Sequence, residues 1–205
     1  DPDSARITIG GLWKYNPEGS LRTYRVVEHD GNPDGRLDNV TGLGDDYFSI
    51  AYDNTQSPGH GTATDAVYDG GTVYLTLSGT TSYTATKVWL DNDSTGRPDA
   101  TYYLYRYREE QPYTTAAQVW DTNGNPVTVT SDNGDGTTYT LSYGTDGEGN
   151  ATLPKYDSEG YAYIYVVREV MEGGGYEQVF GTVNDDGTIT PSPLPEIADT
   201  GRGDR

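Results

Sequence analysis

The sequence contains one stretch twice, and this internal repeat constrains the fold more than any other feature. Residues 12–28 read LWKYNPEGSLRTYRVVE and residues 153–169 read LPKYDSEGYAYIYVVRE, so that Lys14 and Lys155 lie 141 positions apart. Self-similarity at a fixed spacing indicates a structural unit that recurs along the chain. We therefore expect two related domains in the 205 residues rather than one large domain.

The phase of the repeat predicts where the two domains divide. The segment GTVYLTL (71–77) ends the first repeat, and no counterpart of it occurs before Arg205. We predict that residues 1–81 are the C-terminal half of one repeat and that residues 82–205 are the next repeat without its final strand. The first domain is incomplete on this division.

Alternating apolar and polar residues predict short strands. Segments such as TYYLYRYR (101–108) alternate and are bounded by Gly, Asn, Asp and Pro. The net charge of −19 is typical of disordered chains, but 19 tyrosines supply apolar surface that a core can use. We predict an all-β protein with antiparallel sheets packed as a sandwich. The predicted strands cover residues 6–12, 21–28, 47–53, 71–77, 83–90, 100–108, 116–121, 126–131, 137–144, 160–169 and 176–183.

Composition narrows the classes of partner. Asp and Glu outnumber Lys and Arg by 32 to 13, which opposes binding to nucleic acid phosphates. The chain has no cysteine and therefore no disulfide framework. No stretch of about 18 apolar residues is present, so we expect no membrane insertion of this segment.

Three segments of the second repeat carry a resemblance to a known family. Residues 87–105 (KVWLDNDSTGRPDATYYLY), 153–160 (LPKYDSEG) and 165–169 (YVVRE) resemble, in order and spacing, the collagen-adhesin B-type (Cna B-type) repeat of Gram-positive cell-surface proteins. The first repeat carries the later elements, with Trp13 where proline is usual. The resemblance implies tandem immunoglobulin-like β-sandwich domains, strung head to tail in a stalk.

The resemblance also implies a candidate cross-link. Many domains of this family contain a self-made isopeptide bond between a lysine of the first strand and an asparagine of the last, promoted by the glutamate of Tyr-x-Val-x-Glu. Burial favours a neutral lysine amine, which is a nucleophile, and a protonated carboxyl, which can polarise the asparagine carbonyl. Lys87 matches the lysine and Glu169 the glutamate, and we expect the asparagine on a strand beyond Arg205. Without the resemblance, Lys87 would be interpreted as a strand lysine with its amine in water, and Glu169 as a carboxylate on an edge strand.

The first repeat departs from the cross-linking pattern. Glu28 matches Glu169, but the matching lysine would precede Asp1, and Leu75 stands where asparagine is expected. These departures argue against an isopeptide bond in the first repeat.

A loop of the first repeat has the spacing of a calcium site. Hard oxygen ligands at alternate positions suit Ca²⁺, but Thr41 stands where a bidentate carboxylate is wanted. An acidic surface loop is the alternative, and ordinary turn chemistry explains the cluster DTNGN (121–125) without a metal. The residues at calcium-loop positions 1, 3, 5, 7 and 9 are Asp30, Asn32, Asp34, Arg36 and Asp38.

Three classes of function follow from these observations. The first is a structural stalk of a bacterial surface adhesin or pilus-like protein, extracellular and attached to the cell wall, whose partners are neighbouring repeats and, through other regions, a host matrix or surface ligand. The second is a β-sandwich module that binds a host protein or glycan, with or without calcium. The third is an accessory domain of a secreted carbohydrate-active enzyme. We favour the first, which requires no cofactor and no enzyme activity.

Overall fold

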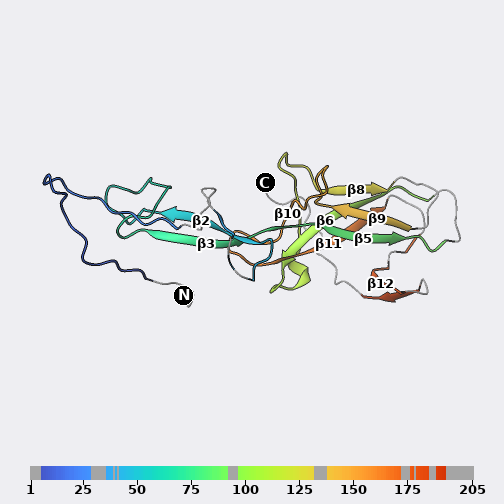
Figure 1. Cartoon of the computed structure of the whole chain (residues 1–205). Helices are drawn as coiled ribbons and strands as arrows, with labels where there is room; N and C mark the ends of the chain where they lie inside the picture. Colours follow the sequence, from blue (N-terminus) through green and yellow to red (C-terminus); the bar gives the residue numbers. More distant parts are fainter. Residues whose placement is uncertain are drawn as a thin grey trace. The chain divides into compact units, whose positions relative to one another are not determined.

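The regular secondary structure consists almost entirely of short strands (Figure 1). The structure is a computed structural model and describes residues 6–28, 36–38, 40, 42–91, 97–131, 138–171, 176–177, 179–184 and 188–192. Within these ranges no α-helix occurs, and several sheets are antiparallel. The all-β prediction is confirmed.

Most of the longer strands follow predicted segments, whereas the short strands at 36–37, 80–81, 153–154 and 189–191 were not predicted. Strands predicted at 47–53 and 100–108 have those bounds, and the others are mostly shorter than predicted. In chain order the elements are β1 (Arg36–Leu37), β2 (Tyr47–Asp53), β3 (Thr72–Ser78), β4 (Thr80–Thr81), β5 (Tyr83–Val88), β6 (Ala100–Arg108), the 3-10 helix η1 (Tyr113–Thr115), β7 (Ala117–Gln118), β8 (Thr128–Ser131), β9 (Thr138–Tyr143), β10 (Leu153–Pro154), β11 (Tyr163–Met171), β12 (Gly181–Val183) and β13 (Ile189–Pro191).

The chain forms two compact units. The first contains Asp1–Asn39 and Phe48–Leu75, and the second contains Val40–Tyr47 and Thr76–Arg205. A three-stranded sheet in the order β1-β2-β3 accounts for most of the pairing in the first unit. The predicted division between residues 81 and 82 refers to the two sequence repeats, and it stays a prediction.

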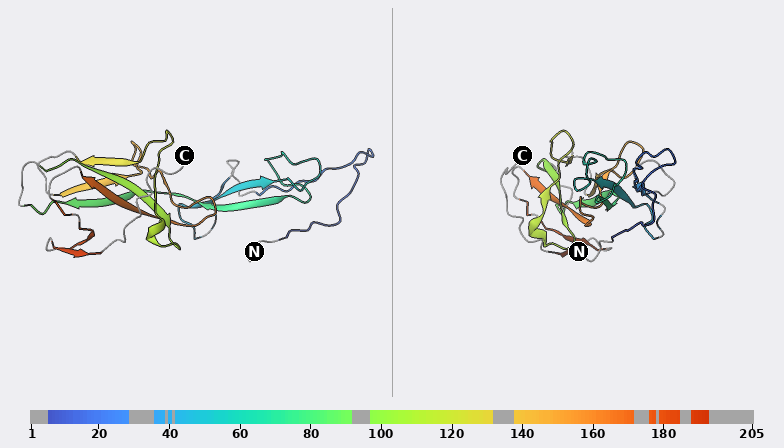
Figure 2. Two further views of the ribbon diagram at one scale, coloured as in Figure 1. Left: turned by 180° about the vertical axis from the view of Figure 1, so that it is seen from behind. Right: turned by 90° about the vertical axis from the view of Figure 1, so that its left-hand side faces the viewer.

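The second unit is built around two sheets whose side chains share one core. In one sheet β6 pairs with β11 along its whole length and with β7 and β8 on its other edge; in the other, β5 pairs with β9. Figure 2 shows β5 and β9 side by side from behind. Most of the buried core residues come from these two sheets, and Leu153 of β10 and Val119 after β7 complete the core, an arrangement compatible with a sandwich: Ala100, Tyr102, Leu104, Val119, Leu141, Tyr143, Leu153 and Tyr165.

The inward face of β6 could not be read from the sequence, because both of its alternating sets contain tyrosine. Ala100, Tyr102 and Leu104 are 1%, 2% and 0% exposed, so this set points into the core. The opposite set, which includes Tyr103 and Tyr105, is half-buried. Strand alternation then fixes the inward residues of β11 through the register of the two strands.

The sequence repeat has a counterpart in backbone hydrogen bonding. The Arg22 N–H donates to the Lys14 carbonyl over 2.9 Å, and the Tyr163 N–H donates to the Lys155 carbonyl over 2.9 Å. These two bonds are separated by the same 141 positions as the sequence repeat. The two copies therefore form the same local hairpin.

A tyrosine anchors this hairpin in both copies. The Tyr24 hydroxyl donates to the Trp13 carbonyl, and the Tyr165 hydroxyl donates to the Pro154 carbonyl, each across 11 residues. A buried tyrosine normally finds such a partner for its hydroxyl. Trp13 and Pro154 contribute only their carbonyls to this bond, so the departure from proline at position 13 does not prevent it.

One five-residue turn recurs along the chain. In each example an Asp or Asn side chain accepts the backbone N–H four residues later, and a glycine at the fourth position has positive φ, between 79° and 89°. Glycine adopts this conformation without steric cost. Turn chemistry therefore explains the cluster at 121–125, as predicted. The turns begin at Asn16, Asp121, Asp146 and Asp157.

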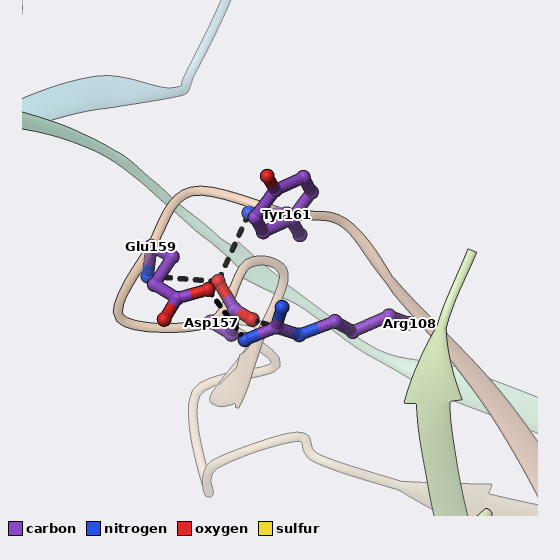
Figure 3. A network of polar contacts seen from close by, with 4 residues as sticks. All are labelled: Arg108, Asp157, Glu159 and Tyr161. Atoms are coloured by element: carbon purple, nitrogen blue, oxygen red, sulfur yellow. Dashed lines mark hydrogen bonds and ion pairs between the residues drawn. The ribbon is translucent and has the colours of Figure 1, made fainter. Parts of the chain in front are cut away.

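The turn at Asp157 is also tied to β6 (Figure 3). Asp157 Oδ1 accepts the backbone N–H groups of Glu159 and Tyr161, while its Oδ2 lies 2.5 Å from Arg108 Nε. Arg108 Nη2 donates to Glu159 Oε2 over 2.8 Å, and its guanidinium lies over the Tyr161 ring. One arginine on β6 thus holds the turn that leads into β11.

Two predicted strands are wrong. The described residues 6–12 contain no strand, and residues 21–28 contain only isolated bridges at Leu21 and Val26. The counterpart of 21–28 in the second repeat is β11, which is held by β6 over nine pairs. Residues 21–28 have no such continuous ladder among the described residues, and Val26 pairs with Val67 only at one isolated bridge.

Truncation of the central core leucine tests the packing of the second unit. Leu104→Ala should lower the free energy of unfolding by about 2–5 kcal/mol, because Leu104 is fully buried and leaves a cavity. The measurement is urea unfolding followed by the emission of Trp89, which is 5% exposed. Leu90→Ala is the control: Leu90 is 70% exposed, so its change should stay within about 0.5 kcal/mol. Equal losses at both positions would contradict the assigned core.

The tyrosine core should make the second unit sensitive to alkali. Burial raises the pKa values of Tyr143, Tyr165 and Tyr83 above the ordinary value. A raised native pKa means that the protonated form stabilises the fold below about pH 10, and that this stability is lost as the pH rises further. Unfolding in urea at increasing pH should show the loss, and Tyr143→Phe should reduce its steepness. A free energy of unfolding that did not change above about pH 10 would contradict the assignment of these tyrosines to the core.

Candidate functional site

Lys87 and Glu169 meet between the two sheets of the second unit. Lys87 Nζ lies 2.8 Å from Glu169 Oε1 and donates to Oε2 over 3.0 Å. Lys87 comes from β5 and Glu169 from β11, which belong to different sheets. The side chains are 16% and 9% exposed, so the contact is largely sheltered from water. The structure thus brings together the two candidates of the second repeat.

Strand alternation explains why both side chains point inward. Ala85 and Tyr83, two and four positions before Lys87, pack against the core, so Lys87 shares their face of β5. Glu169 lies opposite Tyr102 in the register of β11 with β6, and Tyr102 is buried. The sequence therefore places a charged residue at the inward position near the end of each strand.

Two core tyrosines connect this carboxylate to the core. The Tyr102 hydroxyl donates to Glu169 Oε1 over 3.1 Å, and the Tyr143 hydroxyl donates to the Tyr102 carbonyl over 2.9 Å. Burial raises the pKa of Tyr143, so its hydroxyl stays a donor at neutral pH. Tyr102 therefore orients Glu169 towards the lysine.

Trp89 forms the other wall of the site. Its ring centroid lies 4.2 Å from Lys87 Nζ and 5.5 Å from Arg97 Cζ, and Tyr176 packs edge-on against it. Arg97 binds Asp91 in a bidentate pair at 2.8 Å for both bonds, which raises the pKa of the arginine. The tryptophan face attracts the cation of Lys87 and limits its movement.

The arrangement has two chemical capacities. As an ion pair it ties one sheet to the other, because each partner compensates the buried charge of its neighbour. It also places an amine next to a carboxylate that can accept and return protons, the requirement for an assisted acyl transfer. Among the described residues Lys87 contacts Glu169 and Trp89, and no asparagine is placed beside it.

The first-repeat candidates lie in a different setting. The Glu28 N–H donates to the Tyr52 hydroxyl over 3.0 Å, and within the described part of the chain no lysine contacts the Glu28 side chain. Leu75, at the position where asparagine is expected, is 44% exposed on β3. The structure brings neither residue into a site like that of Lys87.

The predicted calcium ligands fall mostly outside the described residues. Asp30, Asn32 and Asp34 lie outside them, whereas Arg36 begins β1 opposite Ser49, and Asp38 follows that strand. Within the described ranges no group of three or more His, Cys, Asp or Glu residues is arranged to hold a metal ion. The calcium site stays a prediction.

Several residues of the site were not predicted from the sequence. Tyr102, Trp89, Arg97 and Asp91 form its walls, yet only Lys87 and Glu169 were singled out. The motif Lys-Val-Trp carried a usable signal, since residues two apart on a strand share a face and a tryptophan there covers the lysine. The tyrosine could not be found this way, because the inward face of β6 was undecided.

Comparisons of the chain with protein-family models, with curated proteins and with solved structures found no match. The described part of the chain also contains no helix of the length and apolar character needed to cross a membrane.

Removal of one partner tests the buried ion pair. Glu169→Gln should lower the free energy of unfolding by about 3–5 kcal/mol, because it leaves the Lys87 charge buried without compensation. Replacing both residues, in Lys87→Met with Glu169→Leu, should cost less than this single change. The exposed pair Arg25–Asp65 supplies the control, since Arg25→Met should change stability by about 0–1 kcal/mol. A larger loss in the double variant than in Glu169→Gln would contradict the pairing.

Proposed function

We propose that this chain is part of the stalk of a bacterial cell-surface adhesin or pilus-like protein, built from tandem immunoglobulin-like sandwich repeats of the Cna B type. The contact of Lys87 with Glu169 carries this proposal. The resemblance assigns these two residues from motifs 82 positions apart, and their side chains lie 2.8 Å apart in a contact largely sheltered from water.

The repeated hairpin supports a tandem arrangement. The same backbone and tyrosine hydrogen bonds recur at residues 13–24 and 154–165, in two different compact units. Repeats of this kind are suited to extended proteins, in which each copy adds length and contacts its neighbours along the chain. Recurrent local structure is expected of a stalk and is not required of a single binding module.

The distribution of tyrosines also favours a structural role. A binding module would gather tyrosines at an exposed groove, whereas Tyr102, Tyr143 and Tyr165 lie in the core, and Tyr83 and Tyr163 pack against it. The apolar surface of these side chains is buried in the interior of the second unit.

The proposed chemistry of the repeat is one intramolecular amide exchange. Lys87 Nζ, deprotonated by Glu169, attacks the Cγ carbon of an asparagine side chain, a new C–N bond forms, the original C–N bond of the asparagine amide breaks, and ammonia leaves. Glu169 takes the proton from the amine and delivers it to the leaving nitrogen. Folding holds the reacting groups together, which supplies an effective concentration of roughly 10⁵ M or more. The product would join the first and last strands of the repeat covalently.

Intact-mass measurement tests the proposal. A chain that continues beyond Arg205 to include the next strand should be lighter than its sequence by roughly 17 Da, the mass of one ammonia. Lys87→Ala should restore the full mass, because the nucleophile is gone.

Glu169→Gln separates the proton shuttle from the nucleophile. This variant keeps Lys87 but should leave the mass at its full value. A full mass in the parent chain would show that the repeat is not cross-linked in this way. A deficit that persists in Lys87→Ala would assign the bond to another amine.

A further inference from the structure

Asp46 lies in a site formed by Lys155 and Tyr156. Lys155 Nζ donates to Asp46 Oδ2 over 2.6 Å, and the Tyr156 hydroxyl donates to the same oxygen over 2.6 Å. The Asp46 side chain is 11% exposed, so its charge is compensated mainly by these two donors. All three residues belong to the second unit, although the predicted division of the repeats assigns Asp46 to the first repeat.

Backbone contacts beside the carboxylate join the same two stretches of chain. β4 pairs antiparallel with β10, and the Lys155 N–H donates to the Gly79 carbonyl over 2.9 Å. A Cβ atom at Gly79 would lie 2.3 Å from Asp46 Oδ1, so glycine is needed for this approach. The short connection from β3 to β5 is therefore a paired strand that runs beside a bound carboxylate.

The lysine and the tyrosine keep one mutual arrangement in both repeats. Lys155 Nζ lies 5.4 Å from the centroid of the Tyr156 ring, and Lys14 Nζ lies 5.6 Å from that of Tyr15. Tyr15 is 52% exposed, and no carboxylate of the described residues contacts Lys14. The lysine and the tyrosine keep this arrangement where no aspartate of the described residues is bound. The pair is therefore already arranged to bind an aspartate carboxylate.

We propose that the Lys-Tyr pair of a repeat is a docking site for the end of the repeat before it, which it recognises through an aspartate carboxylate and a short extended strand. In this chain Asp46 and residues 79–81 are the docked end, and Lys155, Tyr156 and β10 are the receiving site. The proposal extends the stalk proposal, but the isopeptide bond has no part in it.

The charges of the site favour the docked state. Burial alone would raise the pKa of Asp46, but hydrogen bonds from Lys155 and Tyr156 and the charge of the lysine lower it below the ordinary value. The hydrogen bond to Asp46 in turn raises the pKa of Lys155. Both residues are therefore charged when they are in contact.

A double-mutant cycle on the full chain tests the proposal. Asp46→Asn and Lys155→Met should each raise the equilibrium constant for local opening about tenfold or more, measured by hydrogen exchange of the Lys155 amide. The double variant should exchange little faster than either single variant, because the two side chains act on each other. Lys14→Met is the matched control in the other repeat and should leave this exchange unchanged.

Additive effects of the two substitutions, or an equal effect of Lys14→Met, would overturn the proposal. Titration of the Asp46 carboxyl by NMR in the unaltered chain needs no variant, and an ordinary or raised pKa would overturn it as well. Coupling together with a full intact mass would support the docking site while rejecting the cross-link. A mass deficit without coupling between the two substitutions would support the cross-link and reject the docking site.

Discussion

The register of β6 against β11 is the constraint on which the second unit depends. Nine pairs, from Tyr163 with Arg108 to Met171 with Ala100, set which residues of both strands face inward. This register places Glu169 beside Tyr102 on the core side. A slip of one residue would turn Glu169 outward and break its contact with Lys87. The packing of the core and the geometry of the candidate site therefore rest on the same hydrogen-bonded ladder.

Local patterns were enough to predict strands, and non-local pairing explains the failures. Residues 47–53 and 100–108 alternate strongly, and both are strands with the predicted bounds. Residues 21–28 were also predicted as a strand but form none, since a strand exists only with a partner and the partner is not specified by the segment itself. The inward face of 100–108 depended on contacts with Leu141 and other core residues distant in the sequence.

Only those residues of the candidate site that lie in recognisable motifs could be predicted from the sequence. Lys87 and Glu169 stood at recognisable positions, and the structure places them in contact. The contact of Asp46 with Lys155 joins residues 109 positions apart, and no spacing rule connects a turn aspartate to a lysine at that separation. Such a pair becomes visible only when the chain is folded, because the strand pairing of β4 with β10 brings it together.

The recurring five-residue turns reveal how this acidic chain can tolerate change. An Asp or Asn at the first position and a glycine with positive φ at the fourth are the positions that each turn requires, as at Asp146 and Gly149. The hydrogen bonds close within the turns that begin at Asp121 and Asp146, whereas the turn at Asp157 is also held by Arg108. The charge and shape of the tips of the Asp121 and Asp146 turns can therefore be changed by substitution without altering the path of the backbone.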